Sequence, residues 1–176
     1  MQSLNTRAPS RRTFLRTTLA AAAALIAACA DHTVVQPADF TTNTPCALDG
    51  MLLAEFPGPK GQIVYDQGPP DFFCDTVELV STLLAPEQQR RVVGAYTQDM
   101  AQTSWDRPQG HWIDAKQAWY VAGSRRTGSM GPTLATFARQ ADAEAFVRDS
   151  GGKVLRFAEI TPAMVTLDGG VLKDTF

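Results

Sequence analysis

The first half of the chain combines one helical pattern with several short strand patterns. Four apolar side chains recur at intervals of four, three and four residues, which places them on one face of a helix: Phe73, Val77, Val80 and Leu84. We therefore predict a helix over residues 70–84, with Pro86 beyond its end. Short apolar runs on either side predict three strands, at residues 51–56, 62–65 and 91–96.

The second half repeats this order of elements. Apolar runs predict strands at residues 118–122, 134–138 and 154–160. A helix is predicted over residues 141–149, and Gly151–Gly152 ends it because glycine readily adopts the conformation that closes a helix. Each half has the order ββαβ. We therefore predict an α+β fold of two tandem ββαβ units that arose by internal duplication.

The first 28 residues have the features of an export signal. Arg11 and Arg12 lie in a twin-arginine motif at residues 10–16, and an alanine-rich apolar run follows at residues 17–28. That run is too short to span a bilayer, which takes about 20 residues. A basic start followed by a short apolar stretch is typical of a signal peptide. We therefore predict export to the periplasm by the twin-arginine route.

The residues that follow predict a lipid anchor. Residues 26–29 have the sequence Ile-Ala-Ala-Cys, which resembles a bacterial lipobox. Cleavage there would leave Cys29 as the first residue, with acyl chains on its sulfur and amine that hold the protein at a membrane. The alternative is ordinary cleavage near Ala28, which would leave a periplasmic protein without an anchor.

Composition and motifs divide the chain into four predicted segments. We predict a signal peptide at 1–28, an acylated N-terminus and flexible tether at 29–45, a first unit at 46–104, and a second unit with a C-terminal tail at 105–176. The signal peptide holds four of the 16 basic residues and none of the 18 acidic ones, so the remainder carries a net charge of −6. Such a chain, without a basic patch, is not expected to bind nucleic acid.

A tight turn separates two sulfur-bearing residues, Cys46 and Met51. In an extended segment their sulfurs would lie about 16 Å apart. Asp49–Gly50 is a strong turn dipeptide, because glycine accepts a positive φ and aspartate bonds its own backbone. The turn would fold the chain back, so the flexible side chain of Met51 could reach toward Cys46. The alternative is a core methionine beside an inert buried cysteine.

Cys74 is the remaining cysteine and allows several interpretations. We place it in the first turn of the predicted helix, where the helix dipole favours a thiolate and hence reactivity or metal binding. In an oxidising compartment, Cys46 and Cys74 could instead form a disulfide. A packed helix residue is the third interpretation.

A second methionine, Met130, lies in the turn sequence Gly-Ser-Met-Gly-Pro at residues 128–132. Turns lie at the surface, so this side chain is less typical of core packing, although it could fold onto apolar surface. Thiolate and thioether ligands together select Cu(I). Zinc is disfavoured because the chain has no Cys/His quartet, and only His32 and His111 are available. Met100 is a weaker candidate ligand.

Five stretches stand out in order along the chain: CALDGM at 46–51, FFCD at 72–75, YTQDM at 96–100, WIDAKQAWYV at 112–121 and GSMG at 128–131. Together they resemble the NosL family, the accessory lipoproteins of nitrous-oxide reductase. The resemblance extends over most of residues 46–161. Many family members carry Cys-x-x-Cys-Gly-Met, whereas Asp49 stands here in place of the second cysteine. This difference leaves the number of ligands open.

The resemblance implies a fold of two ββαβ units and a role as a periplasmic Cu(I) carrier. Such carriers supply copper for the copper–sulfide centre of nitrous-oxide reductase, together with a membrane-bound maturation complex. Our hypothesis is that the Cys46 thiolate and the thioethers of Met51 and Met130 bind one Cu(I), with Cys74, His111 and Met100 as further candidates.

Delivery of a metal requires no bond-making chemistry, so we do not expect an enzyme. Two alternatives remain open at this point. One is a thiol-based redox enzyme that uses Cys46 and Cys74. The other is a structural lipoprotein that a disulfide between the same two residues stabilises.

Overall fold

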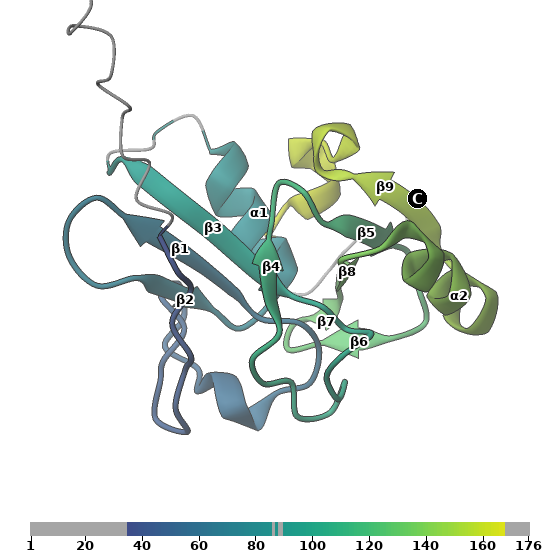
Figure 1. Ribbon diagram of the computed structural model, residues 1–176, viewed down its shortest axis with the longest axis horizontal. Coiled ribbons are helices and arrows are strands. Elements are labelled where there is room, and N and C mark those ends of the chain that lie inside the picture. Colours follow the sequence, from purple (N-terminus) through teal and green to yellow (C-terminus); the bar gives the residue numbers. More distant parts are fainter. Residues whose placement is uncertain (1–34, 86, 88–89, 168–176) are drawn as a thin grey trace, which may run out of the picture. The chain divides into compact units, whose positions relative to one another are not determined.

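Two antiparallel sheets lie on either side of one helix in the computed structural model, which describes residues 35–85, 87 and 90–167 (Figure 1). The first sheet has the strand order β2-β1-β3-β4. Its strands are β1 (Gly61–Tyr65), β2 (Asp71–Phe73), β3 (Val92–Gln98) and β4 (Trp112–Asp114), and helix α1 (Thr76–Leu84) connects β2 to β3. The central strand β1 pairs antiparallel with both β2 and β3.

The second sheet has the order β8-β5-β9, again with its first strand in the centre. Its elements are β5 (Trp119–Ala122), β8 (Ala135–Phe137), α2 (Gln140–Ser150) and β9 (Lys153–Arg156). A small hairpin of β6 (Thr127–Gly128) and β7 (Gly131–Pro132) lies between β5 and β8 in the chain. Three 3-10 turns complete the described elements: η1 (Leu53–Glu55), η2 (Phe157–Glu159) and η3 (Pro162–Val165).

The order ββαβ occurs once in each sheet, within a mixed fold of sheets and helices. In the first sheet the two leading strands are β1 and β2, whereas the sequence pattern predicted strands at 51–56 and 62–65. Strand β2, strand β4 and the β6–β7 hairpin were not predicted. Strand β4 falls within residues 105–176, the predicted second unit, yet pairs with β3 of the first sheet. An origin by internal duplication stays a prediction.

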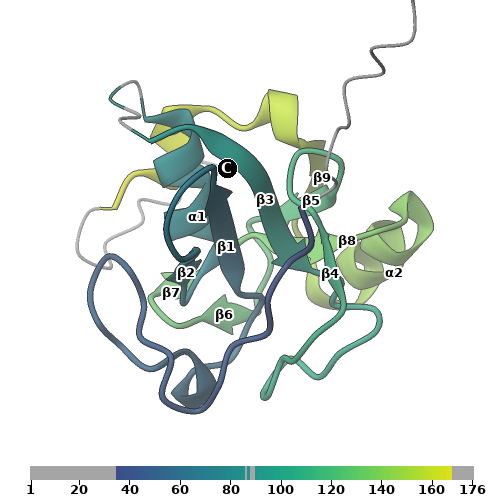
Figure 2. The same ribbon diagram turned by 60° about the vertical axis from the view of Figure 1, so that its left-hand side comes forward.

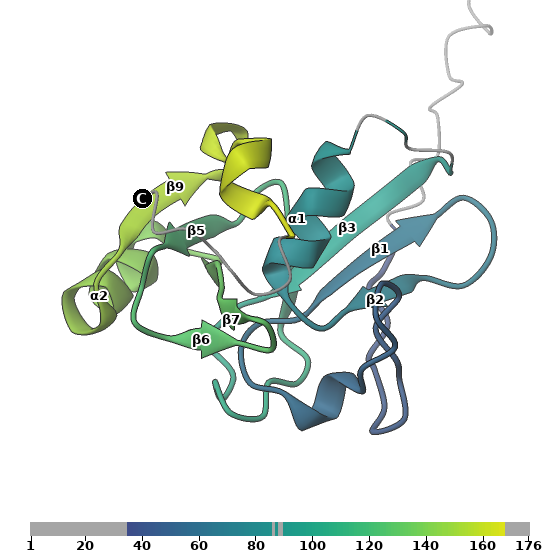
Figure 3. The ribbon, with the colours of Figure 1, turned by 180° about the vertical axis from the view of Figure 1, so that it is seen from behind.

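Helix α1 lies between the two sheets (Figure 3) and packs apolar side chains against both of them. Val77 and Val80 pack in one cluster with Tyr120 of the second sheet. Leu79 packs in another cluster with Ile63 of the first sheet. Residues 77 and 80 lie on one side of a helix and residue 79 on the other, so a single helix seals both sheets.

The other face of the second sheet is covered by α2. Val121 of β5 and Phe137 of β8 pack there with Ala143 and Phe146 of α2. Tyr120 and Val121 are neighbours in β5 but belong to different clusters, because successive side chains in a strand point to opposite faces. None of the helices in the described part of the chain combines the length and apolar character needed to cross a membrane.

Three predicted elements have wrong bounds. Residues 51–56 do not form a strand: Leu52 makes one isolated bridge with Pro45, and η1 follows. The 3-10 conformation of residues 53–55 turns the backbone out of the extended form that a longer ladder needs. The predicted strand at 154–160 ends at Arg156, where η2 begins.

The predicted helix at 70–84 begins only at Thr76, because residues 71–73 pair with β1 as strand β2. Asp75 supplies the start signal: its Oδ1 accepts a hydrogen bond of 2.9 Å from the Val77 N–H. Cys74 therefore precedes the helix and does not lie in its first turn, which corrects the prediction from the sequence.

The C-terminal part of the predicted tether is held against the first sheet. Gln62 exchanges two hydrogen bonds with the backbone of Ala38, at 2.9 and 2.8 Å. The indole N–H of Trp112 donates to Asp39 at 2.7 Å, and Phe40 packs edge-on against the same ring. Residues 38–40 are therefore not a flexible linker. Cys29 and the signal peptide lie outside the described residues.

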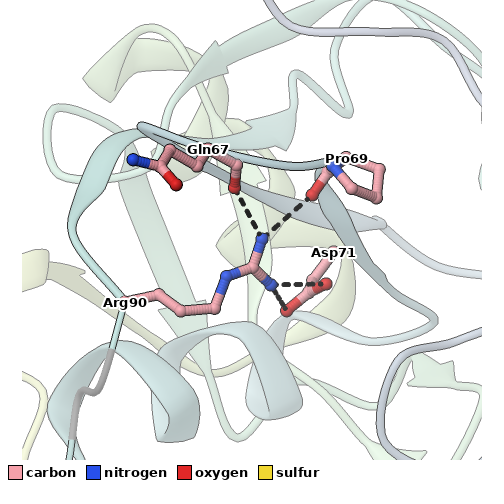
Figure 4. Close-up of polar contacts among 4 residues, drawn as sticks. All are labelled: Gln67, Pro69, Asp71 and Arg90. Carbon is pink, nitrogen blue, oxygen red and sulfur yellow. Dashed lines mark hydrogen bonds and ion pairs between the residues drawn. The ribbon is translucent and has the colours of Figure 1, made fainter.

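The loop that joins β1 to β2 is closed by one arginine (Figure 4). Arg90 donates to the backbone carbonyls of Gln67 and Pro69 and to both carboxylate oxygens of Asp71. Its guanidinium also lies 3.6 Å from the centroid of the Tyr65 ring. The planar guanidinium of arginine has several N–H donors in fixed directions, which suits this set of partners. Lysine would offer only a compact ammonium charge in its place.

We predict that Arg90→Lys lowers the free energy of unfolding by about 1 kcal/mol, because several of these hydrogen bonds are lost while the charge is kept. Urea unfolding followed by circular dichroism measures the change. Arg91→Lys, at the exposed neighbouring position, is the control and should change it by less than about 0.5 kcal/mol. Equal effects of the two substitutions would contradict the role of Arg90.

Candidate metal centre

Four potential ligand side chains from two segments meet at the start of α1: Cys46, Asp49, Cys74 and Glu78. One ligand atom from each lies within 4.8 Å of all the others. Both thiols are free, and both are buried, with 3% of Cys46 and none of Cys74 exposed. Asp49 is exposed, so the group extends from the interior to the surface.

The turn predicted at Asp49–Gly50 is confirmed and brings the first segment back on itself. Gly50 has a φ of +78°, and its N–H donates to the Cys46 carbonyl at 3.0 Å. Asp49 Oδ1 accepts from the Met51 N–H at 2.9 Å, and the Cys46 N–H donates to the Met51 carbonyl at 2.7 Å. Met51 consequently packs against the apolar cluster that contains both cysteines and Leu53.

The second segment is the junction between β2 and α1. Cys74 follows the last residue of the strand, Asp75 caps the helix, and Glu78 lies one helical turn after Cys74. Glu78 Oε2 accepts hydrogen bonds from both thiols, at 3.3 Å from Cys46 Sγ and 3.2 Å from Cys74 Sγ. A single buried carboxylate oxygen therefore joins two cysteines that are 28 positions apart in the sequence.

A further segment, the β6–β7 hairpin, lies near the start of α1 (Figure 2). The Ser129 hydroxyl donates to Cys74 Sγ at 3.1 Å. Met130 follows at the tip and is 39% exposed, so it is one of the large apolar side chains left at the surface. This hairpin matches the predicted surface turn at residues 128–132.

The remaining candidates lie elsewhere. Met100 packs against the cluster beneath α2. His111 is exposed, with a left-handed φ of 51°, and does not belong to the group of four potential ligands. His32 lies outside the described residues.

The two thiols differ in their tendency to ionise. The hydrogen bond between their side chains lowers the pKa of Cys46 and raises that of Cys74. Burial further raises the pKa of Cys74, whereas the Ser129 hydroxyl acts against this rise. Cys46 is therefore the thiol that ionises first, and the thiolate is the form that acts as a nucleophile or metal ligand.

Comparison with known proteins decides the family. The NosL family model matches residues 37–165, a range that contains all four of these side chains. The chain belongs to the NosL family.

Relatives with known names agree with this assignment. The copper-binding lipoprotein NosL of Stutzerimonas stutzeri is 41% identical over 132 residues, which cover 74% of this chain and 69% of that protein. The protein of the same name from Achromobacter cycloclastes is 42% identical over 162 residues, covering 88% and 84%. The crystal structure of the copper chaperone NosL from Shewanella denitrificans is 43% identical, with a TM-score of 0.68, over 72% of this chain and 96% of that one.

This NosL family member also buries one lysine beside the thiols. Lys60 is fully buried, and its ammonium donates to the carbonyl oxygens of Pro57 and Cys74, both at 3.0 Å. Burial lowers the pKa of Lys60 to about 8, against the opposing attraction of Asp75 and of the cysteines and Glu78. The ammonium is therefore still charged at neutral pH.

Sequence reasoning missed Glu78, Ser129 and Lys60, and used Asp49 only as a turn residue. Glu78 could have been found, because a spacing of four residues from Cys74 puts two side chains on one side of a helical turn. Ser129 adjoins the methionine that was noticed. No local signal distinguishes Lys60 from the exposed lysines, since only the tertiary fold buries it.

In this NosL family member the β6–β7 hairpin packs closely on α1, because the backbone of Gly128 lies against the Asp75 carboxylate. A Cβ added at Gly128 would lie 2.1 Å from Asp75 Oδ2 and 3.0 Å from the Cβ of Thr133. The Thr133 hydroxyl itself donates to Asp75 Oδ1 at 2.7 Å. Only glycine fits at position 128 while these bonds persist.

We predict that Gly128→Ala displaces the hairpin and lowers the free energy of unfolding by about 1–3 kcal/mol, the range for overpacking a tight contact. Urea unfolding measures the loss. Thr127→Ala, at the preceding exposed position of β6, is the control and should cost less than about 0.5 kcal/mol. If Gly128→Ala leaves the free energy of unfolding unchanged, the contact between residue 128 and Asp75 has room for a Cβ and the prediction is wrong.

Proposed function

We propose that this chain binds one Cu(I) ion as cargo at the sulfur-bearing side chains around Cys46 and delivers it to an acceptor protein in the periplasm. The acceptor we propose is nitrous-oxide reductase or its membrane-bound maturation complex, during assembly of the copper–sulfide centre. The cargo ligands are Cys46, Met51 and Met130, and Cys74 is the first further candidate.

The observation that carries this proposal is the meeting of two thiols from separate segments beside one carboxylate oxygen. Cys46 and Cys74 both donate to Glu78 Oε2, Met51 packs against them, and Met130 is two residues from Gly128 on the hairpin that bonds Cys74. Thiolate and thioether sulfurs are the donors that favour Cu(I) over harder ions.

The surrounding groups support loading and release of the ion. A thiol must lose its proton before it can bind a metal. Glu78 Oε2 is positioned to accept protons from either thiol, because it already lies 3.2 and 3.3 Å from the two sulfurs. Asp49 and Met130 are exposed, so an acceptor ligand could reach the ion from their side before the buried sulfurs release it.

The relatives' names support the wider role. Two are named copper-binding lipoproteins and a third is named a copper chaperone. We propose accordingly that Cys29 is acylated after export by the twin-arginine route and anchors the protein at the periplasmic face of a membrane. Transfer of cargo between ligands requires no catalysis, so the proposed activity is delivery and not turnover.

The test is an anaerobic Cu(I) titration of the full-length protein, purified in detergent, against a competing chelator. We predict that Cys46→Ser lowers the affinity for Cu(I) by at least tenfold, since it removes the more acidic thiol. Met51→Leu and Met130→Leu should each lower it by several-fold, because leucine keeps the volume but removes the sulfur.

Met100→Leu is the matched control, because Met100 packs beneath α2 and away from the thiols. It should bind Cu(I) as the parent protein does. Equal affinity in all the variants would disprove the proposed ligands. Intact mass before and after alkylation, with and without reductant, tests the alternative of a Cys46–Cys74 disulfide in the isolated protein.

A further inference from the structure

We propose that residues 35–40 form a strap that closes one side of the thiol cluster, the group of Cys46, Asp49, Cys74 and Glu78. The strap opens locally while both sheets stay folded, and the open form makes the two thiols accessible. This inference goes beyond the proposed function, because it concerns access to the thiols and does not depend on the ion that the cluster holds.

Access to the thiols requires a movement of the protein, because only 3% of Cys46 and none of Cys74 is exposed. Phe40 of the strap packs against the apolar cluster that contains both cysteines. Trp112 of β4 meets the Phe40 ring edge-on, with 6.3 Å between the ring centroids. The strap is therefore part of the wall that keeps solvent from the thiols.

The strap is bonded to the first sheet through side chains and not through strand pairing. The bonds come from three strands: Gln62 of β1, Tyr96 of β3 and Trp112 of β4. Gln62 bonds both the N–H and the carbonyl of Ala38, and the Trp112 indole donates to Asp39 Oδ1 at 2.7 Å. The backbone ladders that join these strands use none of these side-chain groups. The strap can therefore leave the sheet without breaking a strand.

The other walls of the cluster are held more firmly. The turn at residues 46–51 has backbone hydrogen bonds of 2.7–3.0 Å, one of them to β2. The β6–β7 hairpin packs against the Asp75 carboxylate at Gly128. In the strap, by contrast, Ala38 and Asp39 are exposed. Exposed hydrogen bonds and few buried contacts are typical of segments that open locally, so the strap is the wall that opens first.

The open population of the strap sets how fast a reagent reaches the thiols. When opening and closing are fast relative to the reaction, the reaction rate is proportional to that population. Loss of one hydrogen bond between strap and sheet should raise the population about threefold to tenfold. Loss of the Phe40 ring, which removes a larger packed surface, should raise it at least tenfold.

The experiment measures how fast iodoacetamide alkylates Cys46 and Cys74 in the full-length, metal-free protein. The protein is purified in detergent and kept reduced and anaerobic at one fixed pH, and mass spectrometry follows each cysteine separately. We expect both cysteines to react about threefold to tenfold faster in Asp39→Ala than in the parent protein. In Phe40→Ala they should react at least tenfold faster.

Matched variants keep the contacts of the strap. Asp39→Asn retains a side-chain oxygen that accepts from the Trp112 indole, so its alkylation rates should stay within about twofold of those of the parent. Phe40→Leu retains a large apolar side chain, so its rates should lie between those of the parent and those of Phe40→Ala.

Urea distinguishes opening of the strap from unfolding of the whole domain. Global unfolding exposes a large surface and is steeply promoted by urea, whereas opening of six residues exposes little. The alkylation rates of the alanine variants should therefore stay nearly constant at urea concentrations below the unfolding transition. Hydrogen exchange over residues 35–41 is a second measure, and it should accelerate in these variants in proportion to alkylation.

An unchanged alkylation rate in Asp39→Ala or in Phe40→Ala would overturn this inference. So would an acceleration that grows with urea in step with global unfolding. If neither variant folds, the parent protein decides: hydrogen exchange over residues 35–41 that is no faster than in β1 and β3 would also overturn it. Because no metal is present, these outcomes leave the proposed function intact, and a failed Cu(I) titration leaves the strap intact.

Discussion

A single buried carboxylate, that of Asp75, joins the parts of the molecule on which the thiol cluster depends. Its Oδ1 accepts from the Val77 N–H and from the Thr133 hydroxyl, which ties the start of α1 to the second sheet. Its Oδ2 faces Gly128 without a hydrogen-bond partner, so the hairpin packs directly upon it. Burial raises the pKa of Asp75 to about 6, a sign of the cost of keeping this group inside.

That arrangement determines where the chemistry lies. Because Asp75 begins the helix, Cys74 stands one residue before it and Glu78 one turn after Cys74. The hairpin that Asp75 supports brings Ser129 to the sulfur of Cys74. The cluster thus depends on helix capping and on one glycine contact as much as on its potential ligands. Such supporting contacts commonly determine how accurately ligands are oriented.

The same region concentrates charge in a way that suits transient binding. Thiols and carboxylates gather around one lysine, so an incoming cation is attracted while part of the negative charge is already balanced. The thiols are buried, but Asp49 and Met130 remain exposed beside them. Under the proposed function, buried donors would retain the ion and the exposed rim would present it to a partner.

Local patterns were sufficient for elements whose signals lie close together in the chain. The turn at Asp49–Gly50, the hairpin tip with Met130 and helix α2 were all predicted, because turn dipeptides, glycines and helical spacing act over a few residues. The same patterns placed the start of α1 too early. Residues 71–73 form a strand because they pair with β1, although Phe73 fits the helical spacing of apolar residues that follows it.

The sequence by itself determined the strands and helix of the second sheet to within a few residues, the sulfur-bearing residues and, through its motifs, the family. Only the tertiary structure decided that Cys46 and Cys74 share one oxygen of Glu78, and that Lys60 is buried beside them. The physical reason is that a helical or turn signal depends on neighbours along the chain. Burial and shared hydrogen bonds depend instead on which distant segments the packed sheets bring together.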